Sequence, residues 1–256
     1  MKIIDKIKLK QENLNANAPI TIVFLGDSVT QGCFECYKTG PDILETVFDY
    51  PSAYSTRIRE IFAILYPNVQ VNIINSGISG DNAGAGGMRL ERDVLSYHPD
   101  LVVVSYGLND AVCGGLAGID CYGERLNEIF SRVIATGAEC IFLTENMMNT
   151  NTSCHLTDSL FIGLAEQFQE IENDGILSAY FERAKEEANK TGVKVCDCYA
   201  KWKQLSKTQD TTLLLANRIN HPTREMHELF AEKLFQTIFG EKTSVADVVS
   251  TMYQGK

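Results

Sequence analysis

The chain has 256 residues, of which 45% are hydrophobic and 22% are charged, as in a globular protein. Its 33 acidic and 23 basic side chains give a net charge of −10, which argues against nucleic-acid binding through a broad basic surface. A single core grows to about 250 residues before chains divide into domains. We therefore expect one domain over residues 1–256, with 1–18 as a leader and 241–256 as a tail on its periphery.

The N-terminus carries the main basic run, made of Lys2, Lys6, Lys8 and Lys10. A basic arm for nucleic acid or a membrane surface is conceivable, but an ordinary solvated leader is the simpler interpretation. No apolar stretch approaches the about 18 residues of a spanning helix, and no secretory signal is evident. We therefore expect a cytoplasmic protein that binds neither nucleic acid nor membrane.

Five short apolar runs, rich in β-branched residues, predict strands that are covered on both faces. These runs are 20–25, 69–74, 101–104, 140–143 and 193–196. Amphipathic helical patterns lie between and after them, at 53–65, 88–95, 126–133, in two segments within 159–189, and at 222–238. This alternation predicts a mostly parallel sheet with helices on both sides.

Three long segments follow predicted strands, namely 33–50, 111–123 and 147–158. They are longer than simple connections need to be. Ligands in such sheets bind beyond the carboxyl ends of the strands, so these segments are the expected rims of a site.

The eight cysteines include a C-x-x-C pair, Cys33 and Cys36, with the spacing of a redox or zinc half-site. A structural zinc site needs a second such pair, and Cys196 and Cys198 have only one residue between them. We therefore expect reduced thiols, no metal site and no dissociable cofactor.

Ser28 follows the first predicted strand directly, within Gly26-Asp27-Ser28. A serine on a tight turn between a strand and a helix presents its hydroxyl beside backbone N–H groups, which suits a nucleophile. On the tripeptide alone, a helix cap is the simpler interpretation. The second and third strands end near Gly80 and Asn109, which taken singly are ordinary turn residues.

Four histidines are available as a base. His98 precedes a strand and so lies at the opposite edge of the sheet, His155 lies in a polar loop, and His227 lies in the last helix, where we expect partial exposure. His221 precedes Pro222 after the fifth strand, and it is the histidine best placed to meet Ser28.

Four blocks at successive strand ends resemble, in this order, the SGNH hydrolases of the GDSL esterase and lipase superfamily. They are Gly26-Asp27-Ser28 with Thr30 and Gly32, Ile78-Ser79-Gly80-Asp81, Gly107-Leu108-Asn109-Asp110, and His221-Pro222. No single block is specific, but their joint occurrence over residues 26–222 makes chance an unsatisfactory explanation.

The resemblance implies a flavodoxin-like three-layer αβα sandwich with five parallel strands in the order 2-1-3-4-5. It also implies Ser28 as nucleophile and His221 as general base. The implied oxyanion donors are the backbone N–H groups of Ser28 and Gly80 and the side-chain amide of Asn109.

One position departs from the family, whose members usually carry Asp three residues before the histidine, where this chain has Arg218. An amide oxygen of Asn217 or Asn220, or a backbone carbonyl, is one replacement to orient the ring of His221; a carboxylate such as Asp210 is another. A third alternative is weakened or lost activity. We expect an oxygen acceptor within about 3.2 Å of the ring Nδ1.

The expected function is a serine esterase that removes a short acyl group, most simply acetyl, from a carbohydrate or similar polar metabolite. The polar rim residues that favour a sugar are Glu35, Tyr37, Tyr106 and Tyr122. The alternatives are an acyltransferase or lipase on the same fold, a non-catalytic carbohydrate-binding module, and a thiol or metal protein built on Cys33 and Cys36. The sequence does not indicate the oligomeric state.

Overall fold

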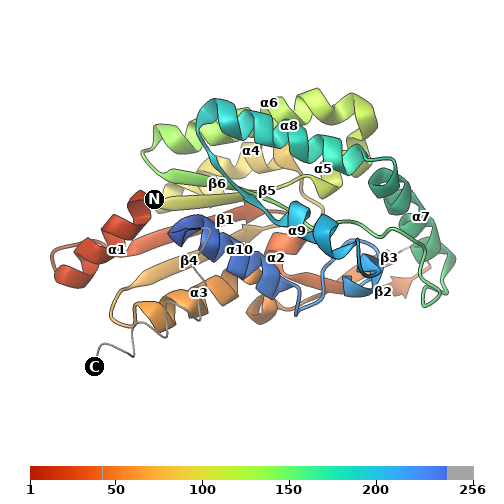
Figure 1. The fold of residues 1–256 in the computed structure, drawn as a ribbon, viewed down its shortest axis with the longest axis horizontal. Helices are drawn as coiled ribbons and strands as arrows, with labels where there is room; N and C mark the ends of the chain where they lie inside the picture. Colours follow the sequence, from red (N-terminus) through yellow and green to blue (C-terminus); the bar gives the residue numbers. More distant parts are fainter. Residues whose placement is uncertain (42, 241–256) are drawn as a thin grey trace.

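The centre of the molecule is a five-stranded parallel sheet. The computed structural model describes residues 1–41 and 43–240, so the expected tail 241–256 lies outside the described residues. The strands are β1 (Ile20–Gly26), β4 (Val71–Gly77), β5 (Leu101–Ser105), β6 (Glu139–Thr144) and β7 (Lys194–Asp197). They lie in the order β4-β1-β5-β6-β7 (Figure 1). This is the predicted order 2-1-3-4-5, and each predicted strand overlaps an observed one.

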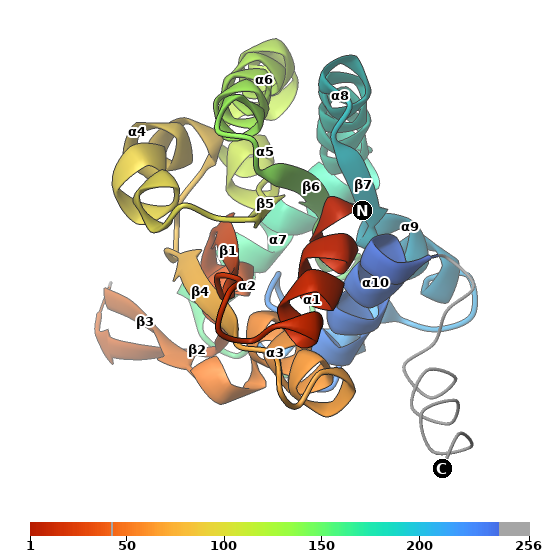
Figure 2. The same ribbon diagram turned by 90° about the vertical axis from the view of Figure 1, so that its left-hand side faces the viewer.

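Helices cover both faces of this sheet, which gives the three layers of the predicted sandwich (Figure 2). One face carries α4 (Ala83–Asp93), α6 (Ile119–Ala135) and α8 (Ile176–Thr191). The other carries α3 (Tyr54–Leu65) and α10 (His227–Phe239). The remaining helices are α1 (Lys2–Glu12), α2 (Ser28–Gln31), α5 (Leu108–Gly114), α7 (Ser159–Asn173) and α9 (Cys198–Leu205). Because both faces are covered, every residue of β5 is buried, as its unbroken apolar sequence predicts.

The N-terminal segment differs from the expected solvated leader. Helix α1 buries Ile3 and Ile7 completely in the hydrophobic core. Lys6 pairs with Asp100, and the ammonium group of Lys10 donates to the carbonyl of Asn17. Two of the four lysines are therefore used within the fold. The alternation of apolar and basic residues that suggested an arm is the pattern of an amphipathic helix.

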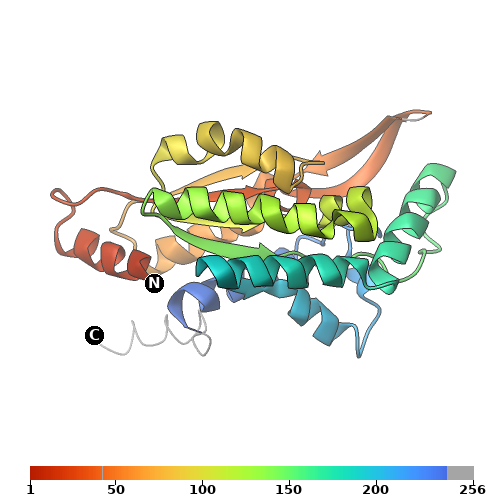
Figure 3. The same ribbon diagram turned by 90° about the horizontal axis from the view of Figure 1, so that it is seen from above.

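The segment 33–50 is also more ordered than a rim loop. It forms an antiparallel hairpin of β2 (Cys33–Gly40) and β3 (Ile43–Phe48), which projects away from the main sheet (Figure 3). Segment 111–123 is likewise largely helical, in α5 and the start of α6. Both lie beyond the carboxyl ends of the strands. In contrast, 147–158 has no helix or strand, as expected.

The last predicted helix begins later than the sequence suggested, at His227 rather than Pro222. His227 is fully buried, contrary to the expected partial exposure, and its Nδ1 accepts a hydrogen bond from the backbone N–H of Tyr54. In the part of the chain that the structure describes, no helix has the length and apolar character needed to cross a membrane.

Candidate active site

Ser28 is the first residue of the short helix α2, directly after β1. The carboxylate of Asp27 caps this helix by accepting a hydrogen bond from the N–H of Val29 at 2.9 Å. The end of β4 packs so closely against α2 that a Cβ on Gly77 would lie 2.3 Å from the N atom of Gln31. The sequence alone favoured Ser28 as the helix cap, but Asp27 is the residue that caps this helix. The Ser28 hydroxyl therefore remains free for another partner.

That partner is His221. Its Nε2 lies 3.0 Å from Oγ of Ser28, and both side chains are buried and line the same cavity. Burial lowers the pKa of His221 to about 4, because the protonated ring loses its hydration. A ring that is neutral near pH 7 can accept the hydroxyl proton, as a general base must.

The other ring nitrogen, Nδ1, lies 2.9 Å from the backbone carbonyl oxygen of Phe34 in β2. The expectation of an oxygen acceptor within about 3.2 Å is therefore confirmed, and among the alternatives the backbone carbonyl is the acceptor. A carbonyl oxygen can accept a hydrogen bond but cannot donate one, so this contact places the proton on Nδ1 and leaves Nε2 free to accept from Ser28. The expected geometry of a serine and histidine pair is complete without a carboxylate.

Asn217 and Asn220 do not orient the ring, contrary to one expectation. The side-chain oxygen of Asn217 accepts from the backbone N–H groups of Ile219, Asn220 and His221 at 2.9 to 3.0 Å. Its amide nitrogen donates to the side-chain oxygen of Asn220. Asparagine folds its own backbone in this way in turns. Asn217 therefore shapes the loop that carries His221 and does not contact its ring.

Asp210 and Arg218 also lie away from the histidine ring. Asp210 caps a short 3-10 helix at the N–H of Thr212 and accepts from the side chain of Asn151, so the proposed carboxylate replacement is wrong. Arg218 has a positive φ of 61° and donates to the carbonyl of Leu213. It occupies the sequence position of the usual aspartate, but the tight loop turns its side chain elsewhere.

The three donor groups that the resemblance implies belong to residues that line this cavity. The N–H of Ser28 is at the first position of a helix and so has no intrahelical acceptor. Gly80 has φ of +80°, and the hydrogen bonds among the described residues include none from its N–H. The side-chain amide of Asn109 donates to the carbonyl of Asp81 at 2.8 Å and to Asp27 at 3.2 Å. Ser28, Gly80 and Asn109 all line the same cavity, as the sequence predicted.

A buried polar network, which the sequence analysis missed, holds these strand ends together. Arg89 of α4 pairs with Asp81 and donates to the carbonyl of Gly26 and the hydroxyl of Tyr106. It thereby joins the ends of β1 and β5 to the turn after β4. An arginine on a helix gives no local sequence signal for this role, because these partners are 8 to 63 residues away and lie at or after the ends of three different strands.

Two buried carboxyl groups lie beneath the donors. Glu145, at the end of β6, is completely buried, accepts from the N–H of Leu108, and has one oxygen without a partner among the described residues. Burial raises the pKa of Glu145 well above its usual value and that of Asp27 to about 6. The two carboxyl groups influence each other's titration, and the negative charge of Asp27 adds to the effect of burial on the pKa of Glu145.

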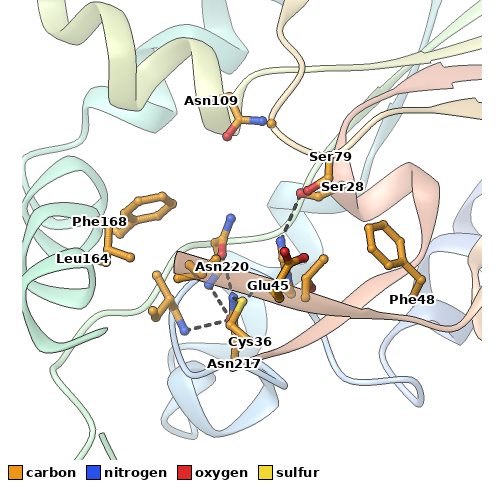
Figure 4. Close-up of a pocket in the computed structure, with 15 residues that line it drawn as sticks. Ser28, Cys36, Glu45, Phe48, Ser79, Asn109, Leu164, Phe168, Asn217 and Asn220 are labelled. Atoms are coloured by element: carbon orange, nitrogen blue, oxygen red, sulfur yellow. Dashed lines mark hydrogen bonds between the residues drawn. The ribbon is translucent and has the colours of Figure 1, made fainter. Parts of the chain in front are cut away.

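The cavity above Ser28 has a volume of about 350 Å³. Its wall is mainly apolar and is built from the β2–β3 hairpin, α7 and the loop before His221; the apolar residues are Leu44, Phe48, Leu164, Phe168 and Ile219. Phe48 of the hairpin and Phe168 of α7 lie on opposite sides of it (Figure 4). The polar rim includes Glu45, Thr46 and Asn220. Of the tyrosines expected at the rim, Tyr106 and Tyr122 are buried and are not among the residues that line this cavity.

The cysteines take no part in this geometry as a metal or disulfide site. All eight are unpaired; Cys33 is buried, and Cys36 lies at the cavity wall, 3.5 Å from the amide nitrogen of Asn217. Burial raises the pKa of Cys33 to about 12, so this thiol stays protonated. Within residues 1–41 and 43–240, no group of three or more histidine, cysteine or acidic side chains is placed to hold a metal ion.

Comparison with known proteins extends the resemblance to most of the chain. Residues 24–229 match the model of the GDSL-like lipase/acylhydrolase family. An acetylxylan esterase from Geobacillus stearothermophilus is 28% identical over 89 residues, which is 35% of this chain and 39% of that protein. The sequence match thus spans well under half of the curated relative.

Solved structures show the same fold over a longer stretch. A mutant of an acetylxylan esterase from Geobacillus stearothermophilus has a TM-score of 0.65 at 20% identity, over 86% of this chain and 94% of the other. An alpha/beta hydrolase enzyme from the metagenome of Lake Arreo in Spain has a TM-score of 0.63 at 20% identity, over 86% and 95%. For the Geobacillus enzyme, catalytic mutants at a serine, an aspartate and a histidine have been crystallised, and its aspartate precedes its histidine by three positions.

The family match covers all four strand-end blocks, Ser28 and His221 included, and the strand order agrees with the fold of these neighbours. Arg218 marks where this chain departs from the serine, aspartate and histidine set of the Geobacillus enzyme. On the extent of the family match, this protein belongs to the GDSL-like lipase/acylhydrolase family of SGNH hydrolases.

Proposed function

We propose that this protein is a serine esterase that removes short acyl groups, principally acetyl, from a carbohydrate. The observation that carries the proposal is the 3.0 Å contact between Oγ of Ser28 and Nε2 of a neutral His221, two residues that line the same cavity. A serine hydroxyl is a weak nucleophile until a neighbouring base takes its proton. This geometry supplies that base beside three oxyanion donors.

In the acylation step, Oγ of Ser28 attacks the ester carbonyl carbon while Nε2 of His221 takes the hydroxyl proton. The carbonyl oxygen becomes an oxyanion, for which the N–H groups of Ser28 and Gly80 are unused donors. Both amide hydrogens of Asn109 already have acceptors, so the oxyanion replaces or shares the longer contact, the one to Asp27. The imidazolium then protonates the leaving alcohol as the tetrahedral intermediate collapses.

In the second half of the reaction, water takes the place of the alcohol. His221 removes a proton from the water, the resulting hydroxide attacks the acyl carbon, and the proton returns to Oγ of Ser28 as the acid leaves. No further group is needed to balance the reaction. The role of the Phe34 carbonyl is to hold the proton of the ring on Nδ1, which leaves Nε2 free to accept the serine proton.

The cavity wall supports a carbohydrate ester as substrate. Aromatic side chains such as Phe48 and Phe168 offer apolar faces on which a sugar ring can lie, and Glu45 and Asn220 offer polar partners at the rim. The relative that acts on acetylated xylan makes an acetylated xylo-oligosaccharide the first substrate to test. The eight unpaired cysteines further support a reducing location such as the cytoplasm.

The test is hydrolysis of p-nitrophenyl acetate and of acetylated xylo-oligosaccharides by the purified protein. We expect turnover by the wild type and a loss of at least about 10⁴-fold in kcat for Ser28→Ala. Ser206→Ala is the control and should leave kcat unchanged, because Ser206 follows α9, is not among the residues that line the cavity, and donates its hydroxyl to the carbonyl of Lys203. Equal activity of the wild type and Ser28→Ala would refute the proposal.

The apolar wall also fits an acyl chain longer than acetyl, which is the observation that favours a lipase-like specificity. Esters of p-nitrophenol with acetate, butyrate and octanoate separate the two. We expect kcat/KM to fall as the chain lengthens. A maximum at octanoate would reassign the cavity from sugar to acyl binding, and Ser28 would keep its role.

A further inference from the structure

The carbonyl that faces His221 belongs to an element that is far from it in sequence. Phe34 and His221 are 187 residues apart, and Phe34 lies in β2 of the projecting hairpin. A triad carboxylate three residues from the histidine would move with the histidine loop. A carbonyl on another element keeps its 2.9 Å contact only if the hairpin is held in place against that loop.

Beyond its base, the hairpin is joined to the rest of the molecule by the ion pair of Lys38 with Asp158 and by the contact of Cys36 with Asn217. Two-stranded hairpins are marginally stable by themselves, and this one leaves the side chains of Tyr37, Ile43 and Phe48 largely exposed. It projects away from the sheet (Figure 3). Its first residues, Cys33 and Phe34, are fully buried. The position of the Phe34 carbonyl therefore depends on contacts at the base of the hairpin.

Arg224 makes those contacts, and it lies three residues after His221. Its guanidinium group donates to both oxygens of Glu35, at 2.6 and 3.1 Å, and to Oδ2 of Asp49 at 2.7 Å. It also lies 4.3 Å from the centre of the Phe34 ring. Glu35 follows Phe34 at the start of the hairpin, and Asp49 follows β3 at its end. One side chain thus joins both ends of the hairpin base to the segment that carries the histidine.

We propose that Arg224 is a positioning residue for catalysis: by clamping Glu35 and Asp49, it fixes the Phe34 carbonyl against Nδ1 of His221. The inference rests on the proposed esterase function. It gives the chain a substitute for the missing aspartate, made of a backbone carbonyl and a charged clamp. The guanidinium fork is suited to this task because it is planar and binds carboxylates at two points.

The charges of the clamp agree with this role. One guanidinium and two carboxylates leave a net charge of −1 beside a ring that becomes cationic in each half-reaction. The negative charge of Glu35 acts to raise the pKa of His221, in opposition to the larger effect of burial. The clamp therefore favours the imidazolium as well as the orientation of the ring.

The experiment compares Arg224→Met and Arg224→Lys with the wild type on p-nitrophenyl acetate. A misplacement of about 1 Å can cost about 10²-fold in rate, so we expect Arg224→Met to lower kcat by about that factor with little change in KM. Lysine keeps the charge but not the fork, so Arg224→Lys should lie between the two. The proton NMR signal of Nδ1–H of His221 should shift or broaden in Arg224→Met, because it reports the contact to Phe34 directly.

Arg183→Met is the matched control, since Arg183 of α8 also pairs with several carboxylates, those of Asp120, Glu186 and Glu187, and is not among the residues that line the cavity. It should lower thermal stability without changing kcat or the NMR signal. If Arg224→Met does not fold, Glu35→Gln takes its place; Glu35 is half-exposed, and glutamine keeps its shape while removing the charge. We expect that variant to lose kcat and to show a lower apparent pKa for His221 in its pH–rate profile.

If Arg224→Met or Glu35→Gln folds, has wild-type kcat and shows an unchanged NMR signal for Nδ1–H of His221, the proposal that Arg224 positions the Phe34 carbonyl is refuted. That result is distinct from failure of the proposed function. An inactive wild type, or a Ser28→Ala variant as active as the wild type, would refute the proposed esterase function. An active wild type with an inactive Ser28→Ala variant supports that function, and the Arg224 variants then test the clamp alone.

Discussion

The two halves of the candidate active site are built in different ways. The nucleophile and oxyanion donors follow three neighbouring strands of one parallel sheet: Ser28 and Asn109 lie in the first turns of short helices, and Gly80 lies on a turn. The base and its acceptor, His221 and Phe34, lie on a loop and a hairpin outside that sheet. We call these the strand-end half and the hairpin half.

The difference concerns which contacts place each group. In the strand-end half, the ladders of β1 with β4 and β5 bring the donors together, and the Asp27 cap and the buried Arg89 network hold the strand ends in place. In the hairpin half, a single 2.9 Å contact spans 187 residues and depends on side-chain clamps. The strand-end half should therefore lose activity mainly when a donor is removed or turned away from the oxyanion. The hairpin half should be sensitive to changes some distance from the reaction.

Removal of a donor from the strand-end half is expected to have the largest effect. Asn109→Ala should lower kcat by about 10²- to 10³-fold with little change in KM, because the oxyanion loses one preorganised donor. Steady-state kinetics with p-nitrophenyl acetate measures this. Asn109→Asp keeps the shape but offers an acceptor, and it should lose at least as much. Wild-type kcat in Asn109→Ala would remove this amide from the oxyanion site.

A substitution that changes the backbone conformation at Gly80 should lower kcat less than the removal of the Asn109 amide. Gly80 has φ of +80°, and a Cβ there would meet no atom within 4 Å, so Gly80→Ala tests conformation and not crowding. The left-handed conformation costs other residues about 1 kcal/mol. We expect that loss of stability in thermal melting, together with a drop in kcat of about tenfold as the N–H turns from the oxyanion.

Gly137 provides the matched control for this glycine, since it has φ of +86° and equally open space, at a turn before β6. Gly137→Ala should lose similar stability while keeping full kcat. If both variants keep full activity, the N–H of Gly80 is not a donor to the oxyanion.

The pH dependence of activity tests the hairpin half without any change to the sequence. Burial lowers the pKa of His221 from 6.5 to about 4, and only the neutral ring can accept the serine proton. Activity is therefore lost as pH falls through the folded-state pKa, so the acid limb of kcat/KM should lie well below 6.5. A pH–rate profile with p-nitrophenyl acetate measures this limb. A limb centred at 6.5 would mean that the ring is hydrated or lies beside a carboxylate.

The same shift has a consequence for stability, with a definite sign. The unfolded chain binds a proton at His221 near pH 6.5, whereas the folded chain binds it only near pH 4. The contribution of His221 to stability is therefore complete above pH 6.5 and decreases as pH falls from 6.5 toward 4. His227, with its pKa lowered to about 3 by burial, acts in the same direction.

The sequence was sufficient for the strand-end half. Unbroken apolar runs identify strands covered on both faces, and the polar residues directly after each run must meet at one edge of a parallel sheet. Ser28, Gly80 and Asn109 follow from that rule together with the family resemblance. The choice of His221 among four histidines follows from its place after the fifth strand. All of these signals are local in sequence, which is why they were readable.

The tertiary structure alone decided how the histidine is held. Every residue has a main-chain carbonyl, so no sequence motif can identify the carbonyl of Phe34 as the acceptor for His221. Arg224, Glu35 and Asp49 look like ordinary surface charges until the fold brings them together across 175 or more residues. Arg218 stands where the family usually has its aspartate, three residues before His221. The sequence therefore suggests an incomplete site, although the group that contacts the histidine ring comes from a distant part of the chain. The sequence determined the fold and the reacting groups; long-range packing determined the partner of the base.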